Sequence, residues 1–162
     1  MTYEYGKIAK SPKDCTDAEL ESFEKMVIEG GEVALAGLRQ RIQRAEKLVF
    51  INDGEFVAVG AIKKPNVGYK ANVFEKSGAP EQSRYEYELG WLYVSSVARG
   101  KGYGHALMES IVDSLSGKAC FATTREDNAS MHYLFDQFGF SKLGQPYRSQ
   151  HGDYSLVIYA KL

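Results

Sequence analysis

The chain has 162 residues, with 20 lysines and arginines against 21 aspartates and glutamates. This near-neutral balance provides no basic field for phosphate backbones, so we expect no nucleic-acid partner. Cys15 and Cys120 stand far apart without CxxC or histidine spacing, and we expect neither a disulfide framework nor a metal site. No apolar run approaches the about 20 residues of a membrane helix, and the N-terminus lacks a signal-peptide pattern. We therefore expect a cytoplasmic protein without membrane contact.

The length fits a single domain over residues 1–162. About 70% of the surface of such a chain can be buried on folding, so the core needs no metal or disulfide.

Hydrophobic periodicity predicts alternating strands and helices. Thr16 and Glu19 form a capping-box pattern for a helix that ends at Gly30 and Gly31. The turn signal at residues 52–54 predicts a hairpin, and polar residues 63–84 are expected to form the longest loop. The other expected strands cover residues 2–10, 48–51, 55–62, 85–94, 119–123, 140–143 and 154–160. The other expected helices cover residues 32–45, 100–115 and 128–138. This order predicts a mixed α/β fold with hairpins and at least one right-handed crossover.

The strongest chemical signal is the glycine-rich segment 94–105, which leaves a predicted strand and enters a predicted helix. Glycines let backbone N–H groups approach a ligand, and a helix N-terminus adds partial positive charge. Arg99 and Lys101 add full charges, so the segment predicts a pyrophosphate-binding turn. Its GxGxG spacing excludes the Walker A and dinucleotide fingerprints. The alternative is a turn that merely joins a strand to a helix.

Two motifs carry a resemblance to a known family. Arg99-x-x-Gly102-x-Gly104, after the strand residues 92–94, resembles motif A of the Gcn5-related N-acetyltransferases (GNAT). Residues 128–140, a predicted helix opened by asparagine and closed by Gly-Phe, resemble motif B of that family. Ser96 departs from the proline of many members, and serine also suits a turn. The resemblance implies a mixed, mostly antiparallel sheet of six to seven strands flanked by about four helices.

By this resemblance the cofactor is acetyl-coenzyme A, and the reaction is direct attack of a primary amine on it in a ternary complex. The backbone N–H groups of residues 100–105 would hold the pyrophosphate, and Leu92 and Val94 would bond the pantetheine arm like an added strand. Asn128 would bond the arm near the thioester, and a backbone N–H near Val94 would stabilise the oxyanion. The implied cofactor-binding residues are Leu92, Tyr93, Val94, Arg99, Gly100, Lys101, Gly102, Tyr103, Gly104, His105 and Asn128.

The resemblance also bears on proton transfer. Glu88 stands where several members carry a catalytic glutamate, and it is the candidate general base for an amine that is mostly charged at pH 7. Phe135 occupies the position of the usual proton-donating tyrosine and has no proton to give. His132 or water could protonate the coenzyme A thiolate instead. Tyr133 lies on the opposite side of the predicted helix and is a poor replacement.

Two other classes of function remain open from the sequence. Phe135 favours an acyl-coenzyme A-binding regulatory or sensor module with little or no turnover. The glycine-rich turn could also bind another phosphate ligand. The acceptor amine could be a small molecule or a protein, and an edge strand near the C-terminus could support a homodimer.

Overall fold

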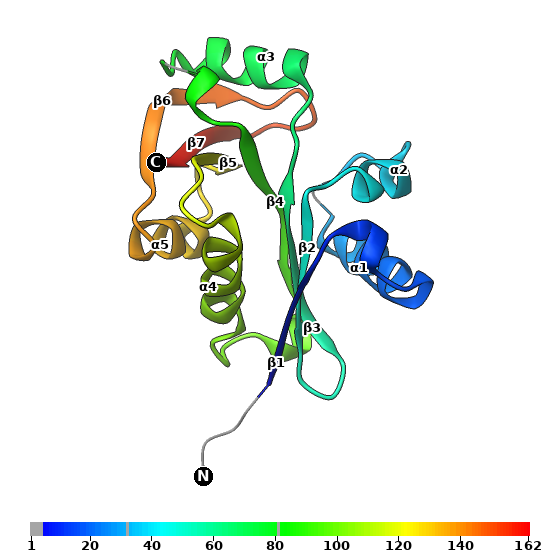
Figure 1. Cartoon of the computed structure of the whole chain (residues 1–162). Coiled ribbons are helices and arrows are strands. Elements are labelled where there is room, and N and C mark those ends of the chain that lie inside the picture. The colour runs from blue at the N-terminus through cyan, green and yellow to red at the C-terminus, as the bar shows by residue number, and fades with distance from the viewer. Residues whose placement is uncertain (1–4, 32, 81) are drawn as a thin grey trace. The chain divides into compact units, whose positions relative to one another are not determined.

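The computed structural model describes residues 5–31, 33–80 and 82–162. Over these residues it contains seven strands and five α-helices, with the strand order β1-β2-β3-β4-β5-β7-β6 (Figure 1). The pairs β1–β2, β2–β3, β5–β7 and β6–β7 are antiparallel, and β4 runs parallel to β5. The predicted mixed, mostly antiparallel α/β fold is confirmed.

The elements have the following bounds. The strands are β1 (Gly6–Lys10), β2 (Lys47–Asn52), β3 (Phe56–Lys63), β4 (Tyr87–Val94), β5 (Cys120–Arg125), β6 (Ser141–Arg148) and β7 (Ser155–Lys161). The helices are α1 (Asp17–Gly30), α2 (Leu38–Gln43), α3 (Val67–Ser77), α4 (Tyr103–Leu115) and α5 (Ala129–Gln137). Residues 2–4 of the expected first strand and Glu32 of an expected helix lie outside the described residues.

The chain divides into two compact units. The first unit consists of residues 1–63 and 90–116, and the second consists of residues 64–89 and 117–162. Strand β4 contributes to both, since its residues from Gly90 onward belong to the first unit. A single domain over residues 1–162 stays a prediction.

In the first unit, helices cover both faces of the sheet. The strand register places Leu48 beside Ala61 and Phe50 beside Val59, and these side chains join the core formed by α1 and α2. The intervening position Gly60 faces α4, where Leu107 and Ile111 approach it. Figure 1 shows α4 on one side of the strands and α1 and α2 on the other. Successive side chains of a strand point to opposite faces of the sheet, so a strand buried on both faces contacts α1 and α2 with one set of residues and α4 with the other.

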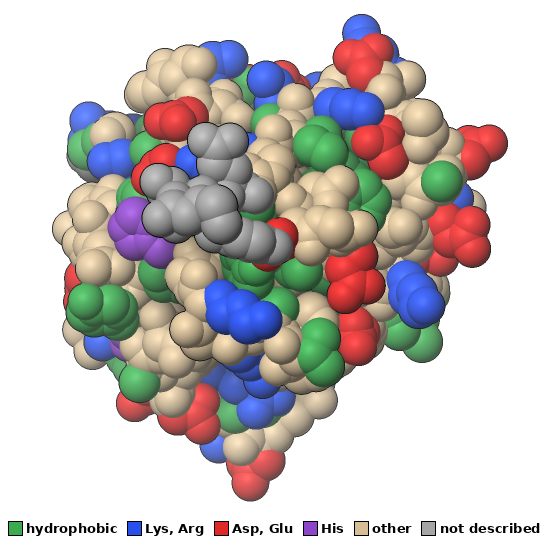
Figure 2. Space-filling view, turned by 90° about the horizontal axis from the view of Figure 1, so that it is seen from below, with side chains coloured by type: hydrophobic (Ala, Val, Ile, Leu, Met, Phe, Trp, Pro, Cys, Tyr) green, Lys and Arg blue, Asp and Glu red, His purple; other side chains and the backbone are tan. Residues whose placement is uncertain are grey.

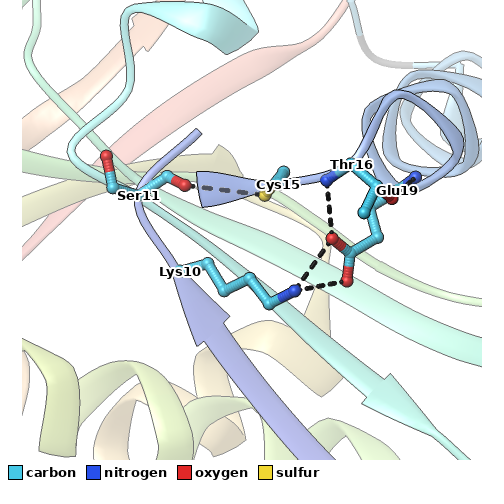
Figure 3. A network of polar contacts seen from close by, with 5 residues as sticks. All are labelled: Lys10, Ser11, Cys15, Thr16 and Glu19. Carbon is cyan, nitrogen blue, oxygen red and sulfur yellow. Dashed lines mark hydrogen bonds and ion pairs between the residues drawn. The ribbon is translucent and has the colours of Figure 1, made fainter. Parts of the chain in front are cut away.

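A network of polar contacts fixes the start of α1 (Figure 3). The Thr16 Oγ1 accepts a hydrogen bond from the Glu19 backbone N–H at 3.1 Å, and the Glu19 carboxylate accepts one from the Thr16 N–H at 2.8 Å. This is the predicted capping box. Lys10, at the end of β1, donates to the same carboxylate at 2.8 Å and holds the pKa of Glu19 below its usual value.

In the second unit, α3 covers one face of the strands β4, β5, β7 and β6. Phe74 of α3 packs edge-on against Phe121 of β5, with ring centroids 5.2 Å apart. Phe121 lies beside Glu88 of β4 and Ala160 of β7 in the strand register, so these three residues share a face. Phe135 of α5 packs against Tyr159, which alternates to the other face of β7.

Two sequence-based expectations about helices are wrong. Residues 63–84 are not one long loop, because α3 occupies residues 67–77 after the cap residue Asn66. The pattern was weak because Pro65, Gly68 and polar residues surround only a short apolar stripe. The helix expected over residues 32–45 contracts to α2, which begins after Gly37, a residue in the left-handed region. No described helix has the length and apolar composition needed to span a bilayer.

Candidate active site

The glycine-rich turn of the first unit has the backbone geometry of an anion site. Gly100 and Gly102 have φ angles of 81° and 83°, in the left-handed region that favours glycine. A Cβ at either position would meet no atom within 4 Å, so backbone conformation rather than crowding requires glycine there. Gly102 is the N-cap of α4 and, as a glycine, has no side chain with which to cap this helix. The N–H groups at the start of a helix have no carbonyl partner within the helix and can bind an anion.

The charged residues of this turn differ in their surroundings. The Arg99 guanidinium lies 6.0 Å from the Tyr93 ring centroid, and its Nε donates to the Val94 carbonyl at 3.4 Å. Arg99 thus stays near the end of β4, whereas Lys101 is exposed within the turn. Acidic and basic side chains are interspersed on the face shown in Figure 2. Positive charge at the turn is therefore a local feature of Arg99, Lys101 and the helix end.

Tyr103 anchors the start of α4 through its side chain. Its hydroxyl donates to the Asp53 carboxylate in the β2–β3 turn, and its ring meets the edge of Tyr5 at 5.6 Å. The side chain is buried. Only the backbone N–H of Tyr103 therefore suits the predicted pyrophosphate contact, while the side chain fixes where the helix begins.

Strand β4 has an unusual backbone next to the predicted pantetheine-binding residues. Trp91 has a φ of 54°, a strained value for a bulky residue inside a strand. Its ring packs edge-on against Phe23 at 6.0 Å, and the Lys63 ammonium lies 4.4 Å from its centroid. Leu92, the next residue, lies against Gly60 on the α4 side. Packing on both sides thus holds the irregular backbone at the point where the predicted contact strand begins.

Glu88 belongs to the second unit, on the face of the strands covered by α3. Only 3% of its surface is exposed, although glutamate is rarely buried unless it is partnered. Oε2 of Glu88 accepts a hydrogen bond from the Tyr69 hydroxyl at 2.7 Å. A buried carboxylate that accepts a hydrogen bond from a neutral donor fits the surroundings of a general base.

The predicted candidates around α5 also belong to the second unit. Asn128 caps the helix, and its Oδ1 accepts a hydrogen bond from the Met131 N–H at 3.2 Å. His132 Nε2 lies 3.0 Å from the Arg125 carbonyl oxygen. Because a carbonyl can only accept, Nε2 carries the hydrogen in this contact. The His132 ring also meets the Tyr159 ring at 5.2 Å.

Phe135 is a core residue in this structure. It is 1% exposed, stacks on Tyr159 at 4.8 Å and lies 5.1 Å from the Phe140 ring. Tyr133 is 64% exposed and accepts a hydrogen bond from Gln137. The expected separation of these two residues on α5 is confirmed, and the identity of the proton donor stays a prediction.

Sequence reasoning missed the residues that surround Glu88. No motif in the sequence links Tyr69 of α3 or Tyr147 of β6 to Glu88. Burial and the charge of Glu88 raise the pKa of both phenols above the ordinary value. Two signals in the sequence could have predicted α3, which carries Tyr69. Asn66 is a favourable residue for the N-terminal cap of this helix, and Gly78 is a favourable residue for its C-terminal cap.

The fold and the glycine-rich turn define the class of protein. The sequence profile described as "Acetyltransferase (GNAT) family" matches residues 14–140, well over half of the chain. The chain belongs to the GNAT acetyltransferase family. Enzymes of this family use acetyl-coenzyme A as the acetyl donor. No curated protein matches the chain in sequence.

Solved structures agree with this fold. Escherichia coli ElaA superposes with a TM-score of 0.73 at 13% identity, covering 98% of this chain and 100% of that one. Arabidopsis thaliana NAA60, in complex with a bisubstrate analogue, gives a TM-score of 0.66 at 12% identity, covering 96% of this chain and 97% of that one. The ribosomal-protein-S18-alanine N-acetyltransferase of Escherichia coli gives 0.65 at 15% identity, covering 96% and 92%. At such identities the likeness establishes the fold alone.

Proposed function

We propose that this chain is an N-acetyltransferase that transfers the acetyl group of acetyl-coenzyme A to a primary amine by direct attack in a ternary complex. The observation that carries the proposal is the turn of residues 99–105. Two left-handed glycines lead into the N-terminus of α4, whose N-cap is Gly102, and Arg99 and Lys101 belong to the same turn. This donor set suits the pyrophosphate of coenzyme A.

The chain's own residues supply binding and proton transfer. The N–H groups of residues 100–105 are proposed to hold the pyrophosphate, residues 92–94 the pantetheine arm, and Asn128 the arm near the thioester. When bound, acetyl-coenzyme A supplies the activated acyl carbon. Glu88 is proposed to accept the proton of the attacking amine, directly or through one water. A solvent water is the proposed proton source for the departing thiolate. The pKa of a free thiol is about 8.5, so the thiolate can take a proton from water without a dedicated acid.

The first experiment measures cofactor binding. We expect saturable binding of acetyl-coenzyme A by calorimetry, preferred over ATP, and strong weakening by Arg99→Glu because the change reverses a charge beside the turn. Lys25→Glu is a matched charge reversal in the middle of α1 and should leave binding unchanged. Absence of binding at about millimolar cofactor would refute the proposal.

The second experiment measures turnover. Thiol release from acetyl-coenzyme A would be followed with spermidine, 2-phenylethylamine, an alanine-starting peptide and a lysine peptide with a blocked N-terminus. Release with any of these amines, reduced strongly by Glu88→Gln, supports the enzyme. Binding with no release across the panel supports the sensor module, which the buried Phe135 favours. The acceptor class, a homodimer and a cytoplasmic location stay predictions.

Strand β6, at the end of the strand order, contains a register shift and Pro146, which make it a poor edge for pairing.

A further inference from the structure

The backbone of Tyr69 is fixed at the first turn of α3. Asn66 caps this helix, and its Oδ1 accepts hydrogen bonds from the N–H groups of Gly68 at 2.9 Å and Tyr69 at 3.2 Å. Phe74, one and a half turns later, packs the helix against Phe121 and Tyr85. Tyr69 therefore projects from a helix end that is both capped and packed.

The side chain of Tyr69 connects solvent-exposed surface to a buried charge. Tyr69 as a whole residue is 40% exposed, while its hydroxyl reaches the carboxylate of Glu88, a residue that is 3% exposed. The 2.7 Å contact is in the range of a hydrogen bond to an ionised acceptor, which is stronger than one between neutral groups. The Thr123 side chain of β5 also hydrogen-bonds to Tyr69. Thr123, Tyr69 and Glu88 thus form one connected chain.

The surroundings of Tyr69 favour the protonated phenol, which can donate to the carboxylate. Burial, and then the charge of Glu88, raises the pKa of Tyr69 well above its ordinary value, whereas the Thr123 bond lowers it. Tyr147 of β6 is another titratable group near Glu88, and its pKa is raised by burial and then by the charge of Glu88. On this face β7 presents the apolar Ile158. A neutral phenol beside a carboxylate favours the charged carboxylate.

We propose that Tyr69 is a positioning residue for Glu88, holding the carboxylate in one orientation and favouring its charged, proton-accepting form. This inference rests on the proposed role of Glu88 as general base. In this proposal α3, which follows β3 and precedes β4 in the sequence, supplies the residue that contacts the Glu88 carboxylate.

The proposal predicts a specific change with pH. Loss of the hydroxyl in Tyr69→Phe removes a hydrogen bond donated to the charged carboxylate, so the carboxylate should protonate at a higher pH, by about one pH unit. The acid limb of the kcat/KM profile should move upward equally. Activity would fall about tenfold more at a pH below both midpoints than on the plateau, where only the orientation of the carboxylate is lost. A merely structural contact would lower activity equally at all pH values.

The experiment is a carboxyl titration of the full chain. Glutamate labelled with ¹³C at the side-chain carboxyl is followed by NMR against pH, and the Glu88 signal is assigned from its absence in Glu88→Gln. Tyr69→Phe is compared with Tyr147→Phe, which removes the neighbouring hydroxyl, and with Tyr133→Phe on the exposed side of α5. All three variants keep their rings, and circular dichroism confirms that each is folded.

The outcomes separate cleanly. An upward midpoint shift of about half a pH unit or more in Tyr69→Phe alone supports the proposal. A smaller or downward shift overturns it, and so does an equal shift in Tyr147→Phe, since the bond from Tyr69 would then not be its cause. The titration needs neither acetyl-coenzyme A nor an acceptor. A chain that shows the shift but no turnover with the amine panel would contradict the proposed function and not the contact between Tyr69 and Glu88.

Discussion

Replacing Gly102 by alanine tests whether the backbone of the glycine-rich turn binds acetyl-coenzyme A. Gly102 has a φ of 83° and is the N-cap of α4. Gly117, just beyond the other end of this helix, has a φ of 81°, and a Cβ at either position would meet nothing within 4 Å. The pair Gly102→Ala and Gly117→Ala therefore introduces the same strain at the two ends of one helix.

The expected magnitudes differ for stability and for binding. A left-handed alanine costs about 1–2 kcal/mol, so each variant should lose this much free energy of unfolding and unfold several degrees earlier. In Gly102→Ala, relief of the strain also rotates the N–H groups that follow. Loss of one hydrogen bond to a charged phosphate costs about 1.5–3 kcal/mol, which corresponds to a Kd about 10- to 100-fold weaker. Gly117→Ala should keep the wild-type Kd.

Urea unfolding and calorimetry with acetyl-coenzyme A measure the two quantities on the same preparations. Equal stability losses with a binding defect confined to Gly102→Ala would support the turn as the pyrophosphate site. A Kd for Gly102→Ala within about threefold of wild type would refute this reasoning, because the N–H groups would then not contact the ligand. Equal binding losses in both variants would refute it too, since they would report general destabilisation.

Three further predictions concern the scaffold. Thr16→Ala should cost about 1 kcal/mol in urea unfolding by removing the acceptor for the Glu19 N–H, and Thr16→Ser should not; equal losses would contradict the capping role. Phe135→Ala should cost about 3–5 kcal/mol because this ring is buried, and a loss below about 1 kcal/mol would contradict its place in the core. Burial raises the pKa of Cys120 to about 12, so little thiolate forms below that pH. Iodoacetamide at about pH 8 should label the partly exposed Cys15 first and Cys120 only in urea; prompt labelling of both in the folded protein would contradict this burial.

Local signals in the sequence were enough to predict much of the fold and the candidate turn. The Thr16–Glu19 capping box, the hairpin at residues 52–54 and the glycine spacing before α4 all depend on residues close in sequence. Their conformations follow from φ preferences and short-range hydrogen bonds, which a sequence states directly. The resemblance to the family, rather than local conformation, identified Phe135 as the residue at the usual position of the proton-donating tyrosine.

The sequence predicted poorly where tertiary contacts outweigh local preference. Helix α3 combines a proline and a glycine near its start with a short apolar stripe, and packing of Phe74 on Phe121 and Tyr85 stabilises it. Helix α2 is shorter than its periodicity suggested, because Gly37 adopts a left-handed conformation just before it. Neither outcome follows from periodicity alone, since α3 depends on partners distant in the chain and α2 depends on the conformation of the glycine before it.

By itself, then, the sequence determined the family motifs and the near-neutral charge, and it predicted a local phosphate-binding turn and Glu88 as the candidate base. Only the tertiary structure decided what surrounds that base. Tyr69 lies 19 residues from Glu88 in the chain, yet its hydroxyl is 2.7 Å from the carboxylate. The physical reason is that a side chain's hydrogen-bond partner and burial are set by the packing of α3 on the strands, and these determine whether a carboxylate is held and charged.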